Sequence, residues 1–433
     1  MSILYTFYGD DFTGSTDVLE QLASNGVPAV LFLGPPTAAH LAAFPGVQAI
    51  GIAGDSRSRS PEWMSANLPA IFTGLKNFAA PVVHYKVCST FDSSPTSGSI
   101  GRAIEIGREI FSSSFVPVVV GAPHLHRYVA FGNLFAADSD GTIRRIDRHS
   151  MSRHPVTPMR EADIRAHLAA QTQTKVGLID VPALESGAAS DAVASLIAAG
   201  YQAILFDTID SQTQATVGAL LWSLAQQAPI FSASSSGLTA ALISAWSTLN
   251  IVTEPAVREP AGPAKPLLIL SGSCSAVTER QIRYALGHSY NGISLDPADL
   301  LDPGGSARAA ALEAATQSLV SGRDTILYTT LGTPTAPVQG DRLGAALGNL
   351  LRDILNRSVA SENPLRRVLL CGGDTSSHAV QQLGLYALTW VASLQPGAPL
   401  CRAHADSELN GLELILKGGQ VGTEDFFDVV RSG

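Results

Sequence analysis

Basic residues are scarce in this sequence, and the first of them is Arg57. The 433 residues contain 28 Lys and Arg against 37 Asp and Glu, which gives a formal net charge of −9. Proteins that bind nucleic acid usually carry a clustered basic face, and the sequence shows no such cluster. The start, MSILYTFYGDD, has neither the basic region nor the apolar run of a secretory signal. We therefore expect no nucleic-acid partner and no secretion.

Long hydrophobic runs and paired cysteines are also missing. No apolar run approaches the ~18 residues that a membrane-spanning helix needs, so no membrane partner is expected. The cysteines are far apart and form no CxxC motif, which is typical of reduced thiols rather than of a disulfide frame or a zinc site. His124 and His126 form an H-x-H pair without a third ligand at a useful spacing, so no metal site is expected. These features predict a cytoplasmic protein.

The composition is that of a globular chain with a large core. Hydrophobic residues make up 45% of the sequence and charged residues 15%, and there are 39 Gly and 25 Pro. A length of 433 residues predicts two or three domains. The stretch 251–266 has four prolines and no periodicity, so we interpret it as a linker. It separates a domain of residues 1–250 from a domain of residues 267–433.

Short apolar segments alternate with amphipathic helical segments in both halves. This alternation predicts an α/β protein, with two α/β domains whose mainly parallel sheets face each other across a cleft. The stretch 142–158 breaks the rhythm and is expected to be a loop. The expected strands are Ile3–Tyr8, Val27–Leu33, Val47–Ala53, Pro81–Val87, Val116–Val120, Lys175–Ile179, Ala203–Phe206, Leu267–Leu270, Thr325–Thr329, Arg367–Cys371 and Leu412–Leu416. Such sheets bind ligands beyond the carboxyl ends of their strands.

Three turns of the second domain follow expected strands and are rich in glycine and serine. They are Ser271–Ser275, Gly372–Ser376 and Lys417–Gly422. Small residues let backbone N–H groups approach a phosphate, and a helix N-terminus adds partial positive charge. Ordinary helix capping explains any one of these turns, but three together favour phosphate binding. No Walker A loop and no strand-linked G-x-G-x-x-G occurs, which disfavours a nicotinamide-dependent oxidoreductase.

The turns of the first domain carry charge instead. Asp10 and Asp11 follow the first strand, where carboxylates serve as base, metal ligand or hydroxyl acceptor. Helix capping explains one of these aspartates better than both. Arg57 and Arg59 follow the third strand and suit a carboxylate or phosphate, although a solvated loop is an equal alternative. Lys86 lies within the fourth strand and could reach an anion at the same edge, although a solvated strand-end lysine is an equal alternative. Together the two domains suit phosphoryl transfer from a nucleotide to a hydroxylated, anionic small molecule.

Several motifs resemble the four-carbon acid sugar kinase family across nearly the whole chain. They are GDDFTGSTDV, the turn at 56–59, SGSCSAVTERQI, GGDTSSHAVQQLG and LKGGQVGTEDFF. The resemblance implies that the first domain binds an acid sugar such as threonate, erythronate or a 3-oxo-tetronate. It implies that the second domain binds ATP with Mg²⁺, and that the terminal hydroxyl of the sugar acid is phosphorylated.

Matching positions assign expected roles to individual residues. Asp10 and Asp11 would lie beside the sugar acid, one of them as base. The groups that would bind the substrate and neutralise its charge are Arg57, Arg59, Lys86 and Ser89. The residues that would contact ATP are Ser273, Ser275, Gly372, Gly373, Asp374, Thr375 and Gly419.

Two segments depart from the family pattern, both on the substrate side. Where many members have Lys-x-Asp-Ser-Thr-Leu-Arg-Gly, Lys86 is followed by Val-Cys-Ser-Thr-Phe-Asp, so Cys88 replaces the usual Asp and the Arg is missing. The Pro-x-x-Gly-Arg turn is here Pro123-His-Leu-His-Arg127. These changes leave open a kinase for a different small hydroxy acid, or a binding protein without transfer activity. The sequence also leaves a homo-oligomer open.

Overall fold

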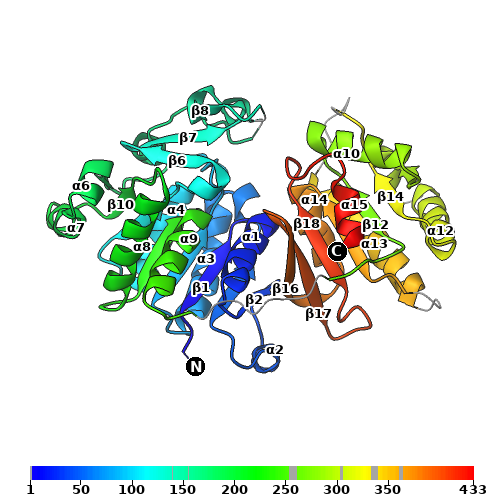
Figure 1. The fold of residues 1–433 in the computed structure, drawn as a ribbon, viewed down its shortest axis with the longest axis horizontal. Coiled ribbons are helices and arrows are strands. Elements are labelled where there is room, and N and C mark those ends of the chain that lie inside the picture. Colours follow the sequence, from blue (N-terminus) through cyan, green and yellow to red (C-terminus); the bar gives the residue numbers. More distant parts are fainter. Residues whose placement is uncertain are drawn as a thin grey trace. The chain divides into compact units, whose positions relative to one another are not determined.

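The computed structural model describes residues 2–138, 140–154, 156–252, 261–302, 306–332, 340–359 and 364–433, without the side chains of residues 340, 341 and 374. The chain forms two compact units (Figure 1). Unit 1 comprises Met1–Ala29 and Ala42–Pro255, and unit 2 comprises Val30–Leu41 and Ala256–Gly433. Of the expected linker, residues 253–260 lie outside the described residues. Both units are α/β with mainly parallel strands, as predicted.

The central sheet of unit 1 has the order β11-β4-β1-β3, and all its strands run parallel. Its strands are β1 (Tyr5–Gly9), β3 (Ala49–Ala53), β4 (Val82–Lys86) and β11 (Ile230–Ser234), and every residue in them is buried. Strands buried on both faces read as continuous apolar runs, which is why the sequence revealed them. Gly9 pairs with both Ala53 and Lys86. The turns that follow β1, β3 and β4 therefore start at one edge.

Helices and a second parallel sheet complete the core of unit 1. The sheet has the order β5-β10-β9, with β5 (Val116–Val119), β9 (Val176–Ile179) and β10 (Ala203–Phe206). The helices are α1 (Phe12–Ser24), α3 (Pro61–Lys76), α4 (Ile100–Phe111), α5 (Ile164–Ala169), α6 (Val181–Glu185), α7 (Ala189–Ala198), α8 (Ser211–Ala225) and α9 (Ser236–Thr248). Helix α4 buries one apolar face that includes Ile104 against this core.

The loop expected at 142–158 contains one short strand, β8 (Ile143–Arg145), which belongs to a small antiparallel sheet. Strands β6 (Arg127–Ala130), β7 (Asn133–Ala137) and β8 form this sheet, and 3₁₀ turns follow at Ile146–Arg148 and Ser150–Arg153. The segment is polar because β8 pairs with β7 alone among the described strands and its residues are largely exposed. Such a strand lacks the apolar alternation by which strands are read from sequence.

The sheet of unit 2 has the order β2-β16-β17-β18-β15-β12-β14-β13. Its strands are β2 (Ala29–Phe32), β12 (Leu268–Ser271), β13 (Asn291–Ser294), β14 (Thr325–Tyr328), β15 (Arg367–Cys371), β16 (Leu385–Gln395), β17 (Ala398–Ala405) and β18 (Glu413–Lys417). The pairs β2–β16, β16–β17 and β17–β18 are antiparallel, whereas β18–β15, β15–β12, β12–β14 and β14–β13 are parallel. The antiparallel hairpin β16–β17 was not expected from the sequence.

The segment Val30–Leu41 joins unit 2, whereas the sequence-based division put it with residues 1–250. In β2, Leu31 and Phe32 pair with β16, and Leu33 N donates to Tyr386 O at 3.0 Å. His40 stacks on Tyr386 with 4.2 Å between ring centroids. Pairing between segments this distant in sequence leaves no local signal.

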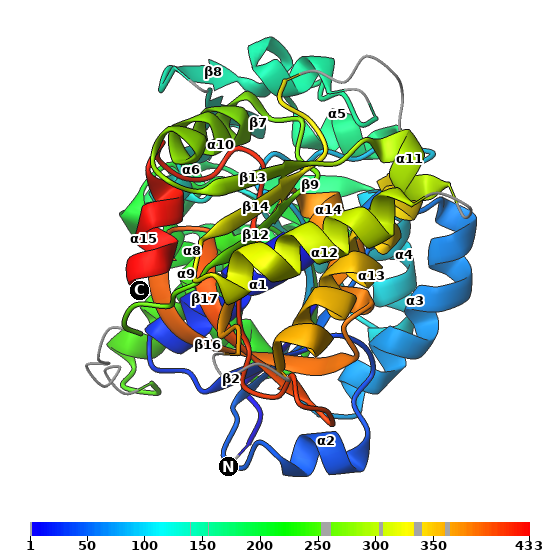
Figure 2. The ribbon, with the colours of Figure 1, turned by 90° about the vertical axis from the view of Figure 1, so that its right-hand side faces the viewer.

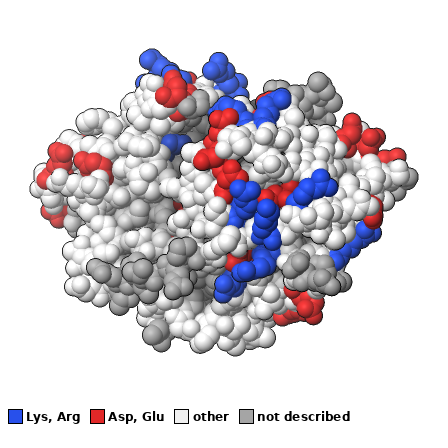
Figure 3. Space-filling model, turned by 45° about the vertical axis from the view of Figure 1, so that its right-hand side comes forward, with Lys and Arg blue, Asp and Glu red and all other residues white. Residues whose placement is uncertain are grey.

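Helices cover the sheet of unit 2. They are α10 (Ala276–Gly287), α11 (Pro297–Leu301), α12 (Ala307–Val320), α13 (Gly340–Val359), α14 (Gly373–Gln381) and α15 (Phe426–Ser432), while the short α2 (Ala38–Ala42) follows β2. Figure 2 shows α12 and α13 in front of β12 and β14. Arg357 of α13 pairs with Glu313 of α12 at 3.0 Å. On the face drawn in Figure 3, acidic and basic side chains lie beside one another.

In the described part of the chain, every helix is too short or too polar to span a membrane.

Candidate active site

The carboxyl ends of β1, β3 and β4 bring three charged turns of unit 1 into contact. Asp10 N donates to Lys86 O at 2.9 Å, and Arg57 N donates to Asp10 O at 3.0 Å. Gly54 N donates to Gly9 O at 2.9 Å. These backbone bonds fix the three turns to one another before any side chain is considered. The turns that the sequence singled out in this domain therefore form one cluster.

Arg57 joins the two aspartates. Its Nε and Nη2 donate to the two carboxylate oxygens of Asp10 at 3.1 and 2.7 Å, and Nη2 also donates to Asp11 Oδ1 at 2.9 Å. The Asp10 side chain is only 5% exposed. Burial raises the pKa of Asp10 to about 6, although the Arg57 guanidinium opposes that rise. Asp10 is therefore the more basic of the two carboxylates.

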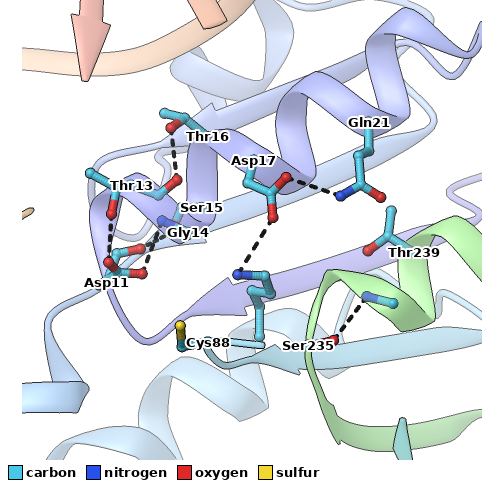
Figure 4. A network of polar contacts seen from close by, with 12 residues as sticks. Asp11, Thr13, Gly14, Ser15, Thr16, Asp17, Gln21, Cys88, Ser235 and Thr239 are labelled. Atoms are coloured by element: carbon cyan, nitrogen blue, oxygen red, sulfur yellow. Dashed lines mark hydrogen bonds and ion pairs between the residues drawn. The ribbon is translucent and has the colours of Figure 1, made fainter. Parts of the chain in front are cut away.

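Asp11 caps helix α1 (Figure 4). Its Oδ1 accepts from Gly14 N at 2.9 Å, and its Oδ2 accepts from the Thr13 hydroxyl at 2.6 Å. Burial raises its pKa, but Arg57, Lys86 and these hydrogen bonds outweigh burial and lower the pKa below its usual value. Capping thus accounts for Asp11 and leaves Asp10 without that explanation.

Lys86 places a cation beside this cap. Its side chain is 3% exposed, and its Nζ lies 3.9 Å from Asp17 Oδ2, beyond hydrogen-bond distance. Asp17 also accepts from Gln21 Nε2 at 3.0 Å. A Cβ on Gly14 would lie 2.8 Å from the Lys86 Nζ, so any larger residue at this position would have to displace the end of that side chain. Asp17 is part of the motif GDDFTGSTDV, and its sequence position alone suggested no role for it.

Arg59 and Ser89 lie differently from Arg57. The Arg59 guanidinium pairs with Asp55 of its own turn and lies over the Trp63 ring, 5.4 Å from the centroid. The structure therefore does not bring Arg59 to Asp10 or Asp11 through any described contact. Ser89 is half-buried in the turn after β4, and its hydroxyl has no hydrogen-bond partner within the described residues.

The structure describes the local contacts and backbone conformation at the two segments that depart from the family pattern. Cys88 Sγ lies 2.9 Å from Thr90 Oγ1, which donates to Asp92 Oδ1 at 2.6 Å. Burial raises the pKa of the Cys88 thiol, so it is neutral. His126 takes the place of a glycine and has φ of 56°, the left-handed conformation that glycine adopts readily. This turn therefore holds a non-glycine residue in a conformation that favours glycine.

In unit 2, the turn after β12 contacts the other two glycine-rich turns. Ser275 caps α10 by accepting from Val277 N at 3.2 Å, and its hydroxyl donates to Gly419 O at 2.6 Å. A Cβ on Gly272 would lie 2.2 Å from Thr375 Oγ1, and one on Gly419 would lie 2.9 Å from Ser273 Oγ. The predicted residues therefore do come together.

Helix α14 begins inside this cluster. Gly372 precedes it with φ of 110°, a conformation for which glycine is suited, and its N–H donates to Lys417 O at 2.8 Å. Gly373 and Thr375 lie in the first turn of the helix, where N–H groups lack helical partners. Asp374 lies there too, but its side chain is outside the described residues.

Sequence reasoning overlooked Lys417. It ends β18, is fully buried, and donates through Nζ to Thr278 Oγ1 and Gly418 O, both at 3.0 Å. A lysine directly before two glycines at the end of a strand was the available signal.

The small residues of unit 2 fit the phosphates of a nucleotide. Two of its three turns lead into helix N-termini, and at Gly272 and Gly419 the backbone packs so closely against Thr375 and Ser273 that a side chain would displace them. In the described ranges, no three His, Cys, Asp or Glu side chains converge as metal ligands would. Mg²⁺ bound to a nucleotide takes most of its ligands from phosphate and water, so it needs no such cage.

Comparison with known proteins agrees with this division. Residues 5–242 match a family model described as a sugar-binding N-terminal domain, and residues 268–427 match a nucleotide-binding C-terminal domain. The chain is 43% identical to a 3-oxo-isoapionate kinase of Paraburkholderia graminis, over 100% of this chain and 94% of that protein. It is 31% identical to a 3-oxo-tetronate kinase of Methylobacterium radiotolerans, over 99% and 98%.

Solved structures show the same fold. A Salmonella typhimurium protein, described as a putative tRNA synthase, superposes with a TM-score of 0.79 at 26% identity, over 98% of both chains. A Haemophilus influenzae protein superposes with a TM-score of 0.72 at 24% identity, over 98% of both chains. The matched domains, the kinase relatives and the two clusters of residues agree: the chain belongs to the four-carbon acid sugar kinase family.

Proposed function

We propose that this kinase transfers the γ-phosphoryl group of ATP to a hydroxyl group of a 3-oxo sugar acid, with 3-oxo-isoapionate as the first candidate. The observation that carries the proposal is the buried cluster of Asp10, Asp11 and Arg57 at the strand ends of unit 1, with Lys86 beside it. This cluster combines a carboxylate of raised pKa with two cations. Those are the groups that an anionic acceptor with a reacting hydroxyl requires.

Asp10 is the proposed base. In the transfer, the acceptor oxygen forms a bond to the γ-phosphorus, the bond to the β,γ-bridging oxygen breaks, and the hydroxyl proton passes to the Asp10 carboxylate. A base works best when its pKa lies near the working pH, and the pKa of Asp10 is raised to about 6. Asp11, whose pKa is lowered, stays ionised and holds Arg57 in place.

The basic residues of unit 1 are proposed to have different roles in binding the substrate and offsetting its charge. The Arg57 guanidinium is bound by both aspartates, so it orients Asp10 and offsets negative charge. Lys86 has no hydrogen-bonded carboxylate, and Ser89 has a free hydroxyl within the described residues. These two residues are therefore proposed to bind the carboxylate of the substrate. Arg59, which is paired with Asp55, would contribute only by exchanging that partner.

The nucleotide is proposed to bind to unit 2 through the three turns. Ser273, Ser275, Gly372, Gly373, Thr375 and Gly419 would hold its phosphates, and Asp374 lies in the same helical turn. When bound, Mg²⁺ would neutralise charge on the β- and γ-phosphates. The four cysteines are free thiols, which, together with the use of ATP, supports a cytoplasmic location.

The relatives guide the choice of acceptor. The relative with 43% identity is named for 3-oxo-isoapionate, and several with about 30% identity are named for 3-oxo-tetronate. Both names share a 3-oxo group on a sugar acid. The departures at Cys88 and Asp92 lie close to the cluster and support an acceptor other than an ordinary four-carbon acid.

The test is ADP release from Mg-ATP with 3-oxo-isoapionate, 3-oxo-tetronate, threonate and erythronate offered separately. We expect the highest kcat/KM with 3-oxo-isoapionate. A higher value with 3-oxo-tetronate would keep the kinase and change its substrate. Absence of ADP release with all four acids, in a protein that binds ATP by calorimetry, would overturn the proposed acceptor class.

A further inference from the structure

Lys417 is a buried cation that contacts helix α10 and the glycine-rich turns at 372–376 and 417–422 of unit 2. Its Nζ donates to Thr278 Oγ1 and to Gly418 O at 3.0 Å, and approaches Gly419 O at 3.4 Å. Its backbone carbonyl accepts from Gly372 N at 2.8 Å. Thr278 belongs to α10, which follows the first turn. One residue therefore connects the starts of two helices and the loop that follows β18.

The charge of Lys417 has no carboxylate partner among the described residues. Its contacts are a hydroxyl and two carbonyl oxygens, and the neighbouring Cys371 is a thiol whose pKa burial raises to about 11. Arg367, another buried cation of this unit, is instead paired with Glu413 at 2.7 Å. Burial lowers the pKa of Lys417, as expected for a cation without a counter-charge. A bound anion would supply the missing negative charge.

The contacts of Lys417 also set the direction of two peptide groups. In a planar trans peptide, the C=O and the N–H point in opposite directions. Gly418 O accepts from Lys417 Nζ, so the N–H of Gly419 points away from the buried lysine. Gly419 O accepts from the hydroxyls of Ser275 and Thr278, so the N–H of Gln420 likewise points away from those hydroxyls. Consecutive outward N–H groups are a common way to bind phosphate.

We infer that Lys417 is the positioning residue of the nucleotide-phosphate site, which turns the N–H groups of residues 419 and 420 outward and supplies positive charge beneath them. The inference rests on the proposed use of ATP and adds a residue to it. This proposed role differs from a role in packing alone, because it predicts that Lys417 affects the binding of ligands that carry phosphate and not the binding of ligands without it. An uncharged ligand such as adenosine gains nothing from the charge or from outward N–H groups.

The test compares Lys417→Met with the wild-type protein by calorimetry, using ATP, ADP and adenosine as separate ligands. We expect the Kd for ATP and ADP to rise roughly tenfold or more, because a charge interaction across a few ångströms is lost. The Kd for adenosine should change less than about twofold. Lys417→Arg keeps the charge and should recover part of the ATP affinity.

Gln281→Leu is the matched control. Gln281 is buried and holds the same loop through neutral hydrogen bonds, donating to Val421 O at 3.1 Å and Thr423 O at 2.8 Å. Equal losses of ATP and adenosine affinity in Lys417→Met, or an equal loss of ATP affinity in Gln281→Leu, would overturn the inference in favour of general loosening. Unchanged ATP affinity in a folded Lys417→Met would overturn it directly. Failure of the wild-type protein to bind ATP would instead refute the proposed function.

Discussion

The two clusters handle charge in opposite ways. In unit 1, Asp10, Asp11 and Arg57 form a compact network of opposite charges, and the pKa values of the two neighbouring aspartates move in opposite directions. In unit 2, the described residues supply backbone N–H groups, hydroxyls and one buried lysine without a carboxylate partner. The first arrangement suits an acceptor whose proton must be removed. The second suits a ligand whose negative charge is constant, and this difference makes the two clusters separable by mutation.

The largest expected effect is that of Asp10→Asn on turnover. The substitution keeps the shape of the side chain but removes the proposed base, so kcat should fall roughly 10²- to 10⁴-fold. The Kd for ATP should stay within a few-fold of the wild-type value, because the change is confined to unit 1. Steady-state ADP release and calorimetry measure the two quantities. A variant that lost ATP binding would show that the roles of the two units are reversed.

Asp163→Asn is the control for this substitution. Asp163 also pairs with an arginine in unit 1, because Arg165 Nη2 lies 2.6 Å from its Oδ2. Neither of these two residues belongs to the cluster of Asp10, Asp11 and Arg57. Its loss should leave kcat within a few-fold. If it lowered kcat as much as Asp10→Asn does, loss of any aspartate–arginine pair would explain both results.

Arg57→Met should have the next largest effect, on stability as well as on activity. It leaves the buried Asp10 and the partly buried Asp11 without their common partner. Removing one member of a buried pair typically lowers the free energy of unfolding by about 3 kcal/mol or more. Chemical denaturation measures this loss. The double variant Arg57→Met/Asp10→Asn should recover part of the stability but no turnover. Lack of any recovery would mean that Arg57 stabilises the fold through contacts other than Asp10.

Much of the fold could be read from the sequence, because buried parallel strands are continuous apolar runs. Every expected strand is present, and β10 and β15 have the expected bounds. The sequence did not predict the hairpin β16–β17, because many residues of β16 are half-buried and the strand therefore lacks a continuous apolar run. The sequence did not predict that β2 belongs to unit 2, because its partner β16 lies more than 350 residues further along the chain.

For the sites as well, the sequence predicted which residues lie at strand ends but not which side chains contact one another. Sequence position located Asp10, Arg57 and the glycine-rich turns, because residues that follow parallel strands gather at one edge. It did not show that Arg57 binds Asp10 and Asp11 whereas Arg59 binds Asp55, since that depends on side-chain direction within one short turn. Sequence position assigned no role to Lys417, because a lysine at the end of a strand is usually solvated, whereas this one is buried.

The pH dependence should sharpen the contrast between the two aspartates. If Asp10 must be ionised, kcat/KM should fall about tenfold per pH unit below pH about 6. Because its pKa is raised on folding, Asp10 stabilises the fold at low pH, and this contribution is lost as the pH rises toward 6. Asp11, with a lowered pKa, contributes stability that is lost as the pH falls.

Asp10→Asn provides the test of that assignment. It should remove the part of the stability curve that declines between about pH 4 and pH 6, while Asp11→Asn should remove the part that rises. Denaturation midpoints across this range measure both. Identical curves for the wild type and Asp10→Asn would show that its pKa is not raised.

The smallest expected effects come from two glycines, one in each cluster. Neither Gly14 nor Gly272 has a positive φ, so alanine is compatible with the backbone at both positions and only space opposes it. A Cβ on Gly14 would lie 2.4 Å from Asp11 Oδ1, and one on Gly272 would lie 2.2 Å from Thr375 Oγ1. Gly14→Ala should raise the KM for the sugar acid several-fold and leave the KM for ATP unchanged, whereas Gly272→Ala should do the reverse. Because alanine favours a helix over glycine by about 1 kcal/mol, α1 should keep its stability in Gly14→Ala, and a changed KM then reports the displaced carboxylate rather than a damaged fold. If both variants raised both KM values equally, the two clusters would act as one site, and the contrast between them would fail.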